Sequence, residues 1–236
     1  MGGLGILSYK TEVFAGNREA LLGLLTPGQT KAVVQASSKL GRVWLTTIPF
    51  RPSLRLTDFE VAAALQLRIL AGEREAHCTS CGDANFFGHE VCLQRKPWRV
   101  ARHEGSKRFI GPALASTPGS QLGSQATGLA NAEYDLTVVS LASKEAPSTS
   151  LPEQDHNPSL LVNKYLDSVA DHKVRHRPTS NLPFHPIVFS LGGMMNGSTT
   201  KVFASWKQVM THGTYNLMLK RLSLCLLQAR VRSVEL

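Results

Sequence analysis

Three of the four cysteines lie in one short segment, residues 77–92, together with two histidines. The candidate metal ligands follow a C-x2-C-x7-H-x2-C spacing and are Cys78, Cys81, His89 and Cys92. Four soft or borderline ligands at this spacing can close a tetrahedron around Zn²⁺, and Gly82 and Gly88 permit tight turns beside them. Since four protein ligands leave no position open for a substrate, the pattern predicts a structural zinc site that holds this segment together.

Two alternatives to this ligand set stay open. His77 also carries an imidazole, but its adjacency to Cys78 would strain the chelate ring, which favours His89. The other alternative is a group of free thiols beside a chance histidine. A disulfide framework is disfavoured, because four cysteines in 236 residues are too few for one, and the clustering of three of them favours a metal site.

The apolar residues predict a chain without a membrane segment. The mean hydropathy is −0.08, and no apolar run approaches the roughly 18 to 20 residues that span a bilayer. The N-terminus lacks the basic-then-apolar layout of a signal peptide. We therefore expect a soluble protein of an intracellular, reducing compartment, with no membrane partner.

Lysine and arginine outnumber aspartate and glutamate by 26 to 17, and the excess lies in two blocks. Residues 172–234 contain no acidic side chain, and residues 93–108 set six basic side chains against Glu104 alone. Such blocks suit a polyanion, because phosphate neutralisation by Lys and Arg releases counterions. The alternative is a solvated basic surface. Trp98 and Trp206 interrupt the blocks and are expected to pack in a core rather than to stack on bases.

The first 75 residues read as helical. Pro27 at a first helical position opens one helix, and the capping box Thr57-x-x-Glu60 opens another. The second helix is expected to present Val61, Leu65 and Ile69 on one inward face. Residues 111–133, rich in Gly, Ser and Ala, read as a flexible linker.

The second half alternates strands and helices. Residues 134–141 form a β-branched apolar run typical of a buried strand, a helix follows over 158–177, and residues 184–195 give a second strand. One or two basic amphipathic helices are expected over 200–232. This order predicts a small α/β layer. Lys173 falls at the end of the inward face of the first helix, where it either reaches solvent or meets an acid.

Seven segments and the cysteine cluster together resemble the C-terminal part of the polyprotein of site-specific non-LTR retrotransposons. The resemblance covers nearly the whole chain and rests on the order of its pieces. In that family a reverse transcriptase thumb and linker lead into a CCHC zinc knuckle and then a restriction-like endonuclease. The segments are GGLGILSYK (2–10), WLTTIP (44–49), LTDFEVAAALQLRI (56–69), RVARHE (99–104), YDLTVVSL (134–141), ADHKVRH (170–176) and FHPIVFSLGG (184–193).

The resemblance implies an endonuclease of the PD-(D/E)xK type, in which carboxylates hold Mg²⁺ and a lysine positions or activates the attacking water. By position it assigns the catalytic roles to Asp135 and Lys173, and it matches Arg102 and His103 to the Arg-His pair that follows the knuckle. With the basic blocks, the expected nucleic-acid contacts are Arg95, Lys96, Arg99, Arg102, His103, Lys207, Lys220 and Arg221.

The sequence also departs from the family pattern. No acidic strand motif stands between His103 and Asp135, where the family places its first metal-binding aspartate. Glu104 and Glu133 are the acids nearby, and neither has the strand context in which the family places that aspartate. The chain has no YxDD-like element, so we expect no reverse transcriptase activity. Both a Mg²⁺-dependent DNA endonuclease and a non-catalytic nucleic-acid-binding module therefore stay open, as does an unrelated zinc protein-interaction domain.

The expected organisation is a helical thumb or linker region (1–75), a zinc knuckle with a basic tail (76–104), a flexible linker (105–133) and an α/β endonuclease-like region (134–236). The fold class is α+β or α/β. The expected partners are DNA, the RNA of the element, or both, and the expected location is the nucleus. No small-molecule substrate is indicated.

Overall fold

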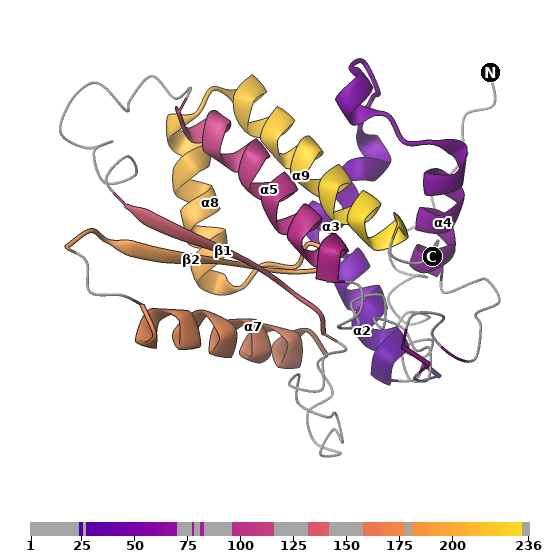
Figure 1. Ribbon diagram of the computed structural model, residues 1–236, viewed down its shortest axis with the longest axis horizontal. Coiled ribbons are helices and arrows are strands. Elements are labelled where there is room, and N and C mark those ends of the chain that lie inside the picture. Colours follow the sequence, from indigo (N-terminus) through magenta and orange to yellow (C-terminus); the bar gives the residue numbers. More distant parts are fainter. Residues whose placement is uncertain are drawn as a thin grey trace, which may run out of the picture.

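The computed structural model describes residues 24–25, 27–69, 77, 81–82, 96–115, 132–141, 158–177 and 181–232. The described helices and strands combine a helical array with a two-stranded sheet, so the fold is mixed α and β, as expected (Figure 1). In chain order they are α2 (Pro27–Ala36), α3 (Lys39–Val43), η1 (Trp44–Thr46), η2 (Pro52–Leu54), α4 (Asp58–Ile69), α5 (Lys96–Ala115), β1 (Glu133–Val139), α7 (Pro158–Arg175), β2 (Phe184–Ser190), α8 (Gly197–Val209) and α9 (His212–Arg232).

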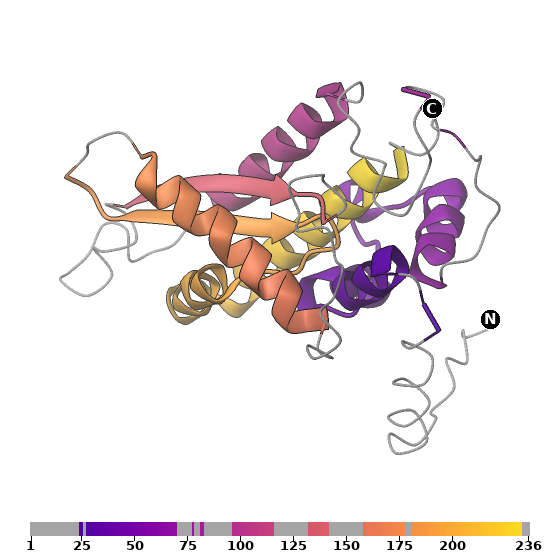
Figure 2. The same cartoon turned by 90° about the horizontal axis from the view of Figure 1, so that it is seen from below.

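The sheet is a parallel pair joined by α7, as the predicted strand–helix–strand order requires. Its register runs from Glu133 opposite Phe184 to Val139 opposite Ser190. Helix α7 covers one face, whereas α5 and α9 lie on the other side, so the sheet is enclosed between helices (Figures 1 and 2). Within the described part of the chain, no helix has both the length and the apolar character needed to cross a membrane.

Side chains of β1 alternate between these two faces, as in any strand. Tyr134, Leu136 and Val138 point to the larger core around Trp206, and Val139 packs with the cluster under α7. The α7 face of β1 therefore carries Glu133, Asp135, Thr137 and Val139.

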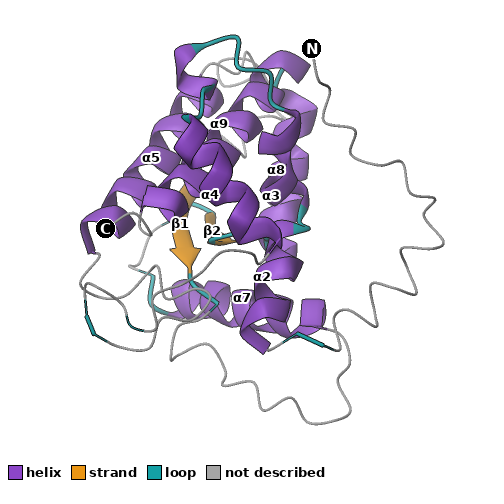
Figure 3. Cartoon of the chain, turned by 90° about the vertical axis from the view of Figure 1, so that its right-hand side faces the viewer, coloured by secondary structure: helices purple, strands orange, loops and turns teal. Residues whose placement is uncertain are grey.

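The larger core joins segments that are far apart in the sequence. Trp206 and Leu222 are fully buried in it, which confirms the packing role of this tryptophan. Leu40 of α3 and Ile110 of α5 belong to the same cluster. Each fully buried apolar side chain of this size contributes about 1.5–3 kcal/mol. Helix α3 thus shares this core with the α/β region, and both α3 and α4 lie against α9 (Figure 3).

Helix α5 differs from the expected organisation. Residues 105–115, predicted as the start of a linker, are helical. Gly105 of this helix allows close packing, because a Cβ there would lie 2.7 Å from the Sγ of Cys225 on α9. Ile110 and Ala113 of the same helix are buried.

The inward face of α4 also differs from the prediction. Val61 and Leu65 are 36% and 37% exposed, whereas Glu60, Ala64 and Leu67 are buried. Glu60 belongs to the capping box and also accepts a hydrogen bond of 3.3 Å from Gln228 of α9. Because this bond holds Glu60 against α9, the face of α4 that contains Glu60, Ala64 and Leu67 is the buried one.

The predicted capping box of α4 is confirmed. The Glu60 backbone N–H donates to Thr57 Oγ1 at 3.1 Å, and the Thr57 N–H donates to Glu60 Oε2 at 2.9 Å. We expect Thr57→Ala to lower the free energy of unfolding by about 1 kcal/mol, because one orphan amide loses its acceptor. Urea unfolding measures this change. Thr57→Ser keeps the hydroxyl and is the control; equal losses in both variants would contradict the capping role.

Candidate functional site

The two residues predicted as catalytic lie together. The Nζ of Lys173, in the last turn of α7, is 3.0 Å from the Oδ2 of Asp135 on β1. Their side chains are 38% and 36% exposed, so solvent and a large substrate can reach both. Of the two expected positions for Lys173, the structure therefore has the one in which it meets an acid. A pair this exposed adds little stability.

A second acid–base pair lies beside the first. Glu133 precedes Asp135 by two residues on the same face of β1, and its Oε2 is 3.6 Å from a terminal nitrogen of Arg177. The Arg177 guanidinium also lies over the ring of Phe184, 5.1 Å from its centroid. The predicted strand began at residue 134, whereas β1 begins one residue earlier, at Glu133. One strand face thus presents two carboxylates, each held by a cation.

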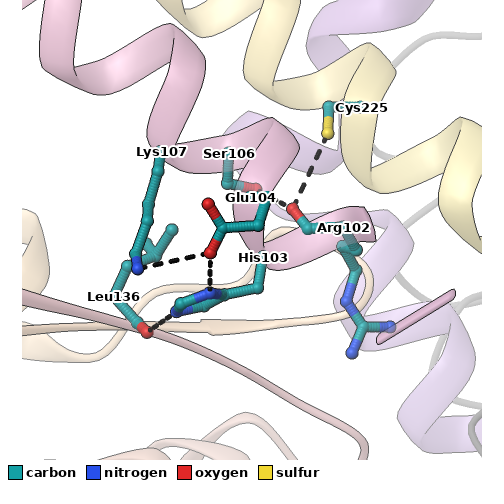
Figure 4. Close-up of polar contacts among 7 residues, drawn as sticks. All are labelled: Arg102, His103, Glu104, Ser106, Lys107, Leu136 and Cys225. Carbon is teal, nitrogen blue, oxygen red and sulfur yellow. Dashed lines mark hydrogen bonds and ion pairs between the residues drawn. The ribbon is translucent and has the colours of Figure 1, made fainter. Parts of the chain in front are cut away.

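His103 connects α5 to the same strand. Its Nε2 lies 2.8 Å from the carbonyl oxygen of Leu136, next to Asp135, and its Nδ1 lies 3.2 Å from Glu104 Oε1 (Figure 4). The hydrogen bond with His103, followed by that with Lys107, holds the pKa of the Glu104 carboxyl below its ordinary value. Because Glu104 is engaged by side chains of its own helix, Glu133 is the better placed second carboxylate.

Arg102 differs from the expectation of a phosphate contact at the surface. It is only 5% exposed. The packing of α5 on α9 turns this position inward: the Arg102 carbonyl accepts from Ser106 Oγ at 2.9 Å and lies 3.9 Å from the Cys225 Sγ. Figure 4 shows the Arg102 side chain directed away from His103 and Glu104.

The other expected nucleic-acid contacts are placed as follows. Lys207 on α8 is exposed, and Lys220 and Arg221 on α9 are partly exposed. Lys96 and Arg99 belong to the first turn of α5, and Arg95 lies outside the described residues. The basic side chains therefore reach the surface from both α8 and α9.

Most of the predicted zinc site lies outside the described residues, namely Cys78, His89 and Cys92. Cys81 is described and partly buried. Gly82 has a φ of +75°, in the left-handed region that glycine enters readily. Among the described residues, which include one of the four expected ligands, no group of three or more His, Cys, Asp or Glu side chains can hold a metal ion.

The donor set on the α7 face of β1 fits Mg²⁺. This ion is usually held by one or two carboxylates, together with water and substrate phosphate oxygens. Asp135 and Glu133 supply two carboxylates there, with side chains 36% and 41% exposed.

Comparisons with protein-family models, curated proteins and solved structures found no match to this chain.

Proposed function

We propose that this chain belongs to the polyprotein of a site-specific non-LTR retrotransposon and that its β1–α7–β2 unit is a metal-dependent endonuclease that nicks target DNA. The observation that carries the proposal is the 3.0 Å approach of Lys173 to Asp135. An acid on a core strand and a lysine on the following helix are the two positions that the resemblance assigned to catalysis. Residues 38 positions apart in the sequence meet at one exposed edge of the sheet.

Each side chain around the Asp135–Lys173 pair has a role in phosphodiester cleavage. Mg²⁺, when bound, would be held by Asp135 and Glu133 and would stabilise the charge that develops on the phosphate. The ammonium of Lys173 orients the attacking water and attracts the phosphate. The carboxylate of Asp135 keeps this ammonium in place. Arg177 fixes Glu133, and His103 is a positioning residue because it holds the carbonyl next to Asp135.

A second candidate function is a non-catalytic nucleic-acid-binding module. It is favoured by the fact that both carboxylates on the strand face already pair with cations, with no third carboxylate beside them in the described ranges. In this alternative the knuckle and the basic helices hold DNA or the RNA of the element in the nucleus. A zinc protein-interaction domain, the third alternative, predicts no salt-sensitive binding of DNA.

Nicking of supercoiled plasmid by the purified chain, with Mg²⁺ or Mn²⁺, tests the proposal. We expect relaxed circles to accumulate with either ion and to disappear when excess EDTA is present, because the cleavage requires a divalent cation. A binding assay on the same plasmid accompanies it. Binding without nicking in either ion would reject the endonuclease and leave the non-catalytic module.

The zinc site is proposed as the element that organises the basic tail of the knuckle. We expect the purified chain to bind zinc stoichiometrically, and Cys81→Ser to reduce the zinc content and to raise the Kd for DNA about ten-fold, because metal binding is coupled to local folding. Elemental analysis and fluorescence anisotropy measure the two effects. Cys225→Ser, which alters a cysteine of α9 outside the cluster, is the control. Unchanged DNA affinity after zinc removal would contradict this role.

A further inference from the structure

One exposed aromatic ring lies beside two cations on the far side of the sheet from α7. Phe50, between η1 and η2, is 59% exposed. The guanidinium carbon of Arg51 lies 5.6 Å from its ring centroid, and the Nζ of Lys220 lies 6.0 Å from it. An open hollow of about 360 Å³ is lined in part by Trp44 and by Pro49, the residue before Phe50. The ring is therefore reachable and lies in a positive surrounding.

A second ring and cation continue this surface across α9. The guanidinium carbon of Arg221 lies 5.9 Å from the ring centroid of Phe109 on α5. Lys220 and Arg221 are consecutive on α9 and diverge around the helix axis. One reaches the segment before η2 and the other reaches α5. We define the α9 strip as Phe50, Arg51, Lys220, Arg221 and Phe109.

The cations of the strip lack acidic partners in the described part of the chain. No described ion pair involves Arg51, Lys220 or Arg221, and α9 contains no aspartate or glutamate. The Nε of Arg221 is buried without a hydrogen-bond acceptor there. An anion in solvent does not reach this buried Nε, but Arg221 as a whole is partly exposed, so the unpaired charge of its guanidinium is available to an anion at the surface.

Of the three described acids on the elements around the strip, two are engaged elsewhere, and no described ion pair joins the third, Asp58, to the strip. Glu60 of α4 accepts from Thr57 and Gln228, and Glu104 of α5 is bonded to its neighbours His103 and Lys107. Asp58, in the first turn of α4, is exposed in that helix. The strip thus keeps its positive charge.

We propose that the α9 strip binds single-stranded nucleic acid, with bases stacked on Phe50 and phosphates held by Lys220 and Arg221. An exposed ring flanked by cations matches this ligand, because every base has a π-face and every nucleotide a charged phosphate. Paired bases inside a duplex cannot reach a surface ring. This inference rests on the proposed function: with α7 and α9 on opposite sides of the sheet, one side would cleave duplex DNA while the other holds an unpaired strand (Figure 1).

Fluorescence anisotropy with a labelled single-stranded oligonucleotide of mixed sequence and its duplex form, without divalent cations, tests the α9 strip. We expect Phe50→Ala to raise the Kd for the single strand about ten-fold and to leave that for the duplex unchanged, since stacking is lost and phosphate contacts remain. Phe50→Leu keeps an apolar side chain and should behave like Phe50→Ala, whereas Phe50→Trp should retain affinity. Phe59→Ala, at a 52% exposed ring on α4, is the matched control.

Lys220→Ala should weaken both forms and lower the slope of log Kd against log salt by about one phosphate contact. Lys39→Ala, at an exposed lysine on α3, should change neither affinity. Equal effects of Phe50→Ala on single strand and duplex, or no effect on either, would overturn the stacking site. If such a result is obtained and the chain still nicks plasmid, only the α9 strip is rejected and the endonuclease proposal remains. A chain that neither binds nor cuts nucleic acid would refute both proposals.

Discussion

Replacing Gly41 by alanine is expected to lower the free energy of unfolding by about 3 kcal/mol, although alanine is the better helix former. A Cβ at this position in α3 would lie 2.3 Å from the carbonyl oxygen of Gly192 and 2.8 Å from that of Gln35. Both atoms are backbone, so relief requires α3 to move away from the turn after β2. Such a movement separates elements of one core, and 3 kcal/mol is a large part of the stability of an ordinary domain.

The movement of α3 would also break the hydrogen bonds at the junction between the N-terminal helices and the turn after β2. The N–H of Gly192 donates to Gln35 Oε1 at 3.0 Å, and Ser38 Oγ donates to the Gly192 carbonyl at 3.2 Å. On the other side of α3, Ser223 Oγ donates to the Leu40 carbonyl at 2.7 Å. Each bond contributes about 1 kcal/mol, which is why overpacking here costs more than at an isolated core position.

Gly213→Ala is the matched control, because Gly213 of α9 is also a helical glycine but a Cβ there meets nothing within 4 Å. It should raise the free energy of unfolding by about 0.5–1 kcal/mol through helix propensity alone. Chemical unfolding of the three proteins measures both changes. The two changes in stability are expected to have opposite signs. A Gly41→Ala variant as stable as Gly213→Ala would mean that α3 does not pack against the turn after β2.

This junction also explains why the organisation of the chain could not be predicted fully. The signals for individual elements are local and proved reliable: Pro27 and Pro158 begin helices, and the β-branched run and the second apolar strand form the parallel pair. The meaning of small residues is not local. Gly41 and Gly105 permit close packing of helices against the rest of the fold, whereas in the sequence a glycine favours flexibility as much as contact.

The candidate site, like the fold, could be predicted only in part from the sequence. The helical period placed Lys173 at the end of the apolar face of α7, and that face packs on the sheet, so the lysine reaches the strand that carries Asp135. Arg102 is adjacent to His103 in the same motif, yet one is buried against α9 and the other bonds β1. Which way each turns depends on the tilt of α5, and no local pattern encodes that tilt.

Asp135→Asn is expected to reduce plasmid nicking on the order of a thousandfold. The amide has nearly the same shape but no charge to hold a divalent cation, whose electrostatic contribution is worth several kcal/mol in the transition state. Lys173→Met should also abolish most nicking, because it removes the only ammonium that the described residues place beside Asp135. Neither variant should unfold, since this exposed pair contributes at most about 1 kcal/mol.

Lys164→Met is the control for Lys173→Met, because Lys164 is exposed on the same helix but nine residues earlier, on the opposite side of the axis. Glu133→Gln and Glu104→Gln decide between the two acids near Asp135, and we expect only the former to reduce nicking. Initial rates on supercoiled plasmid, with thermal melting to check folding, give the comparison. If Asp135→Asn and Lys173→Met nick as fast as the unaltered chain, the cleavage does not come from this strand and helix, and the endonuclease assignment fails even though the two side chains touch.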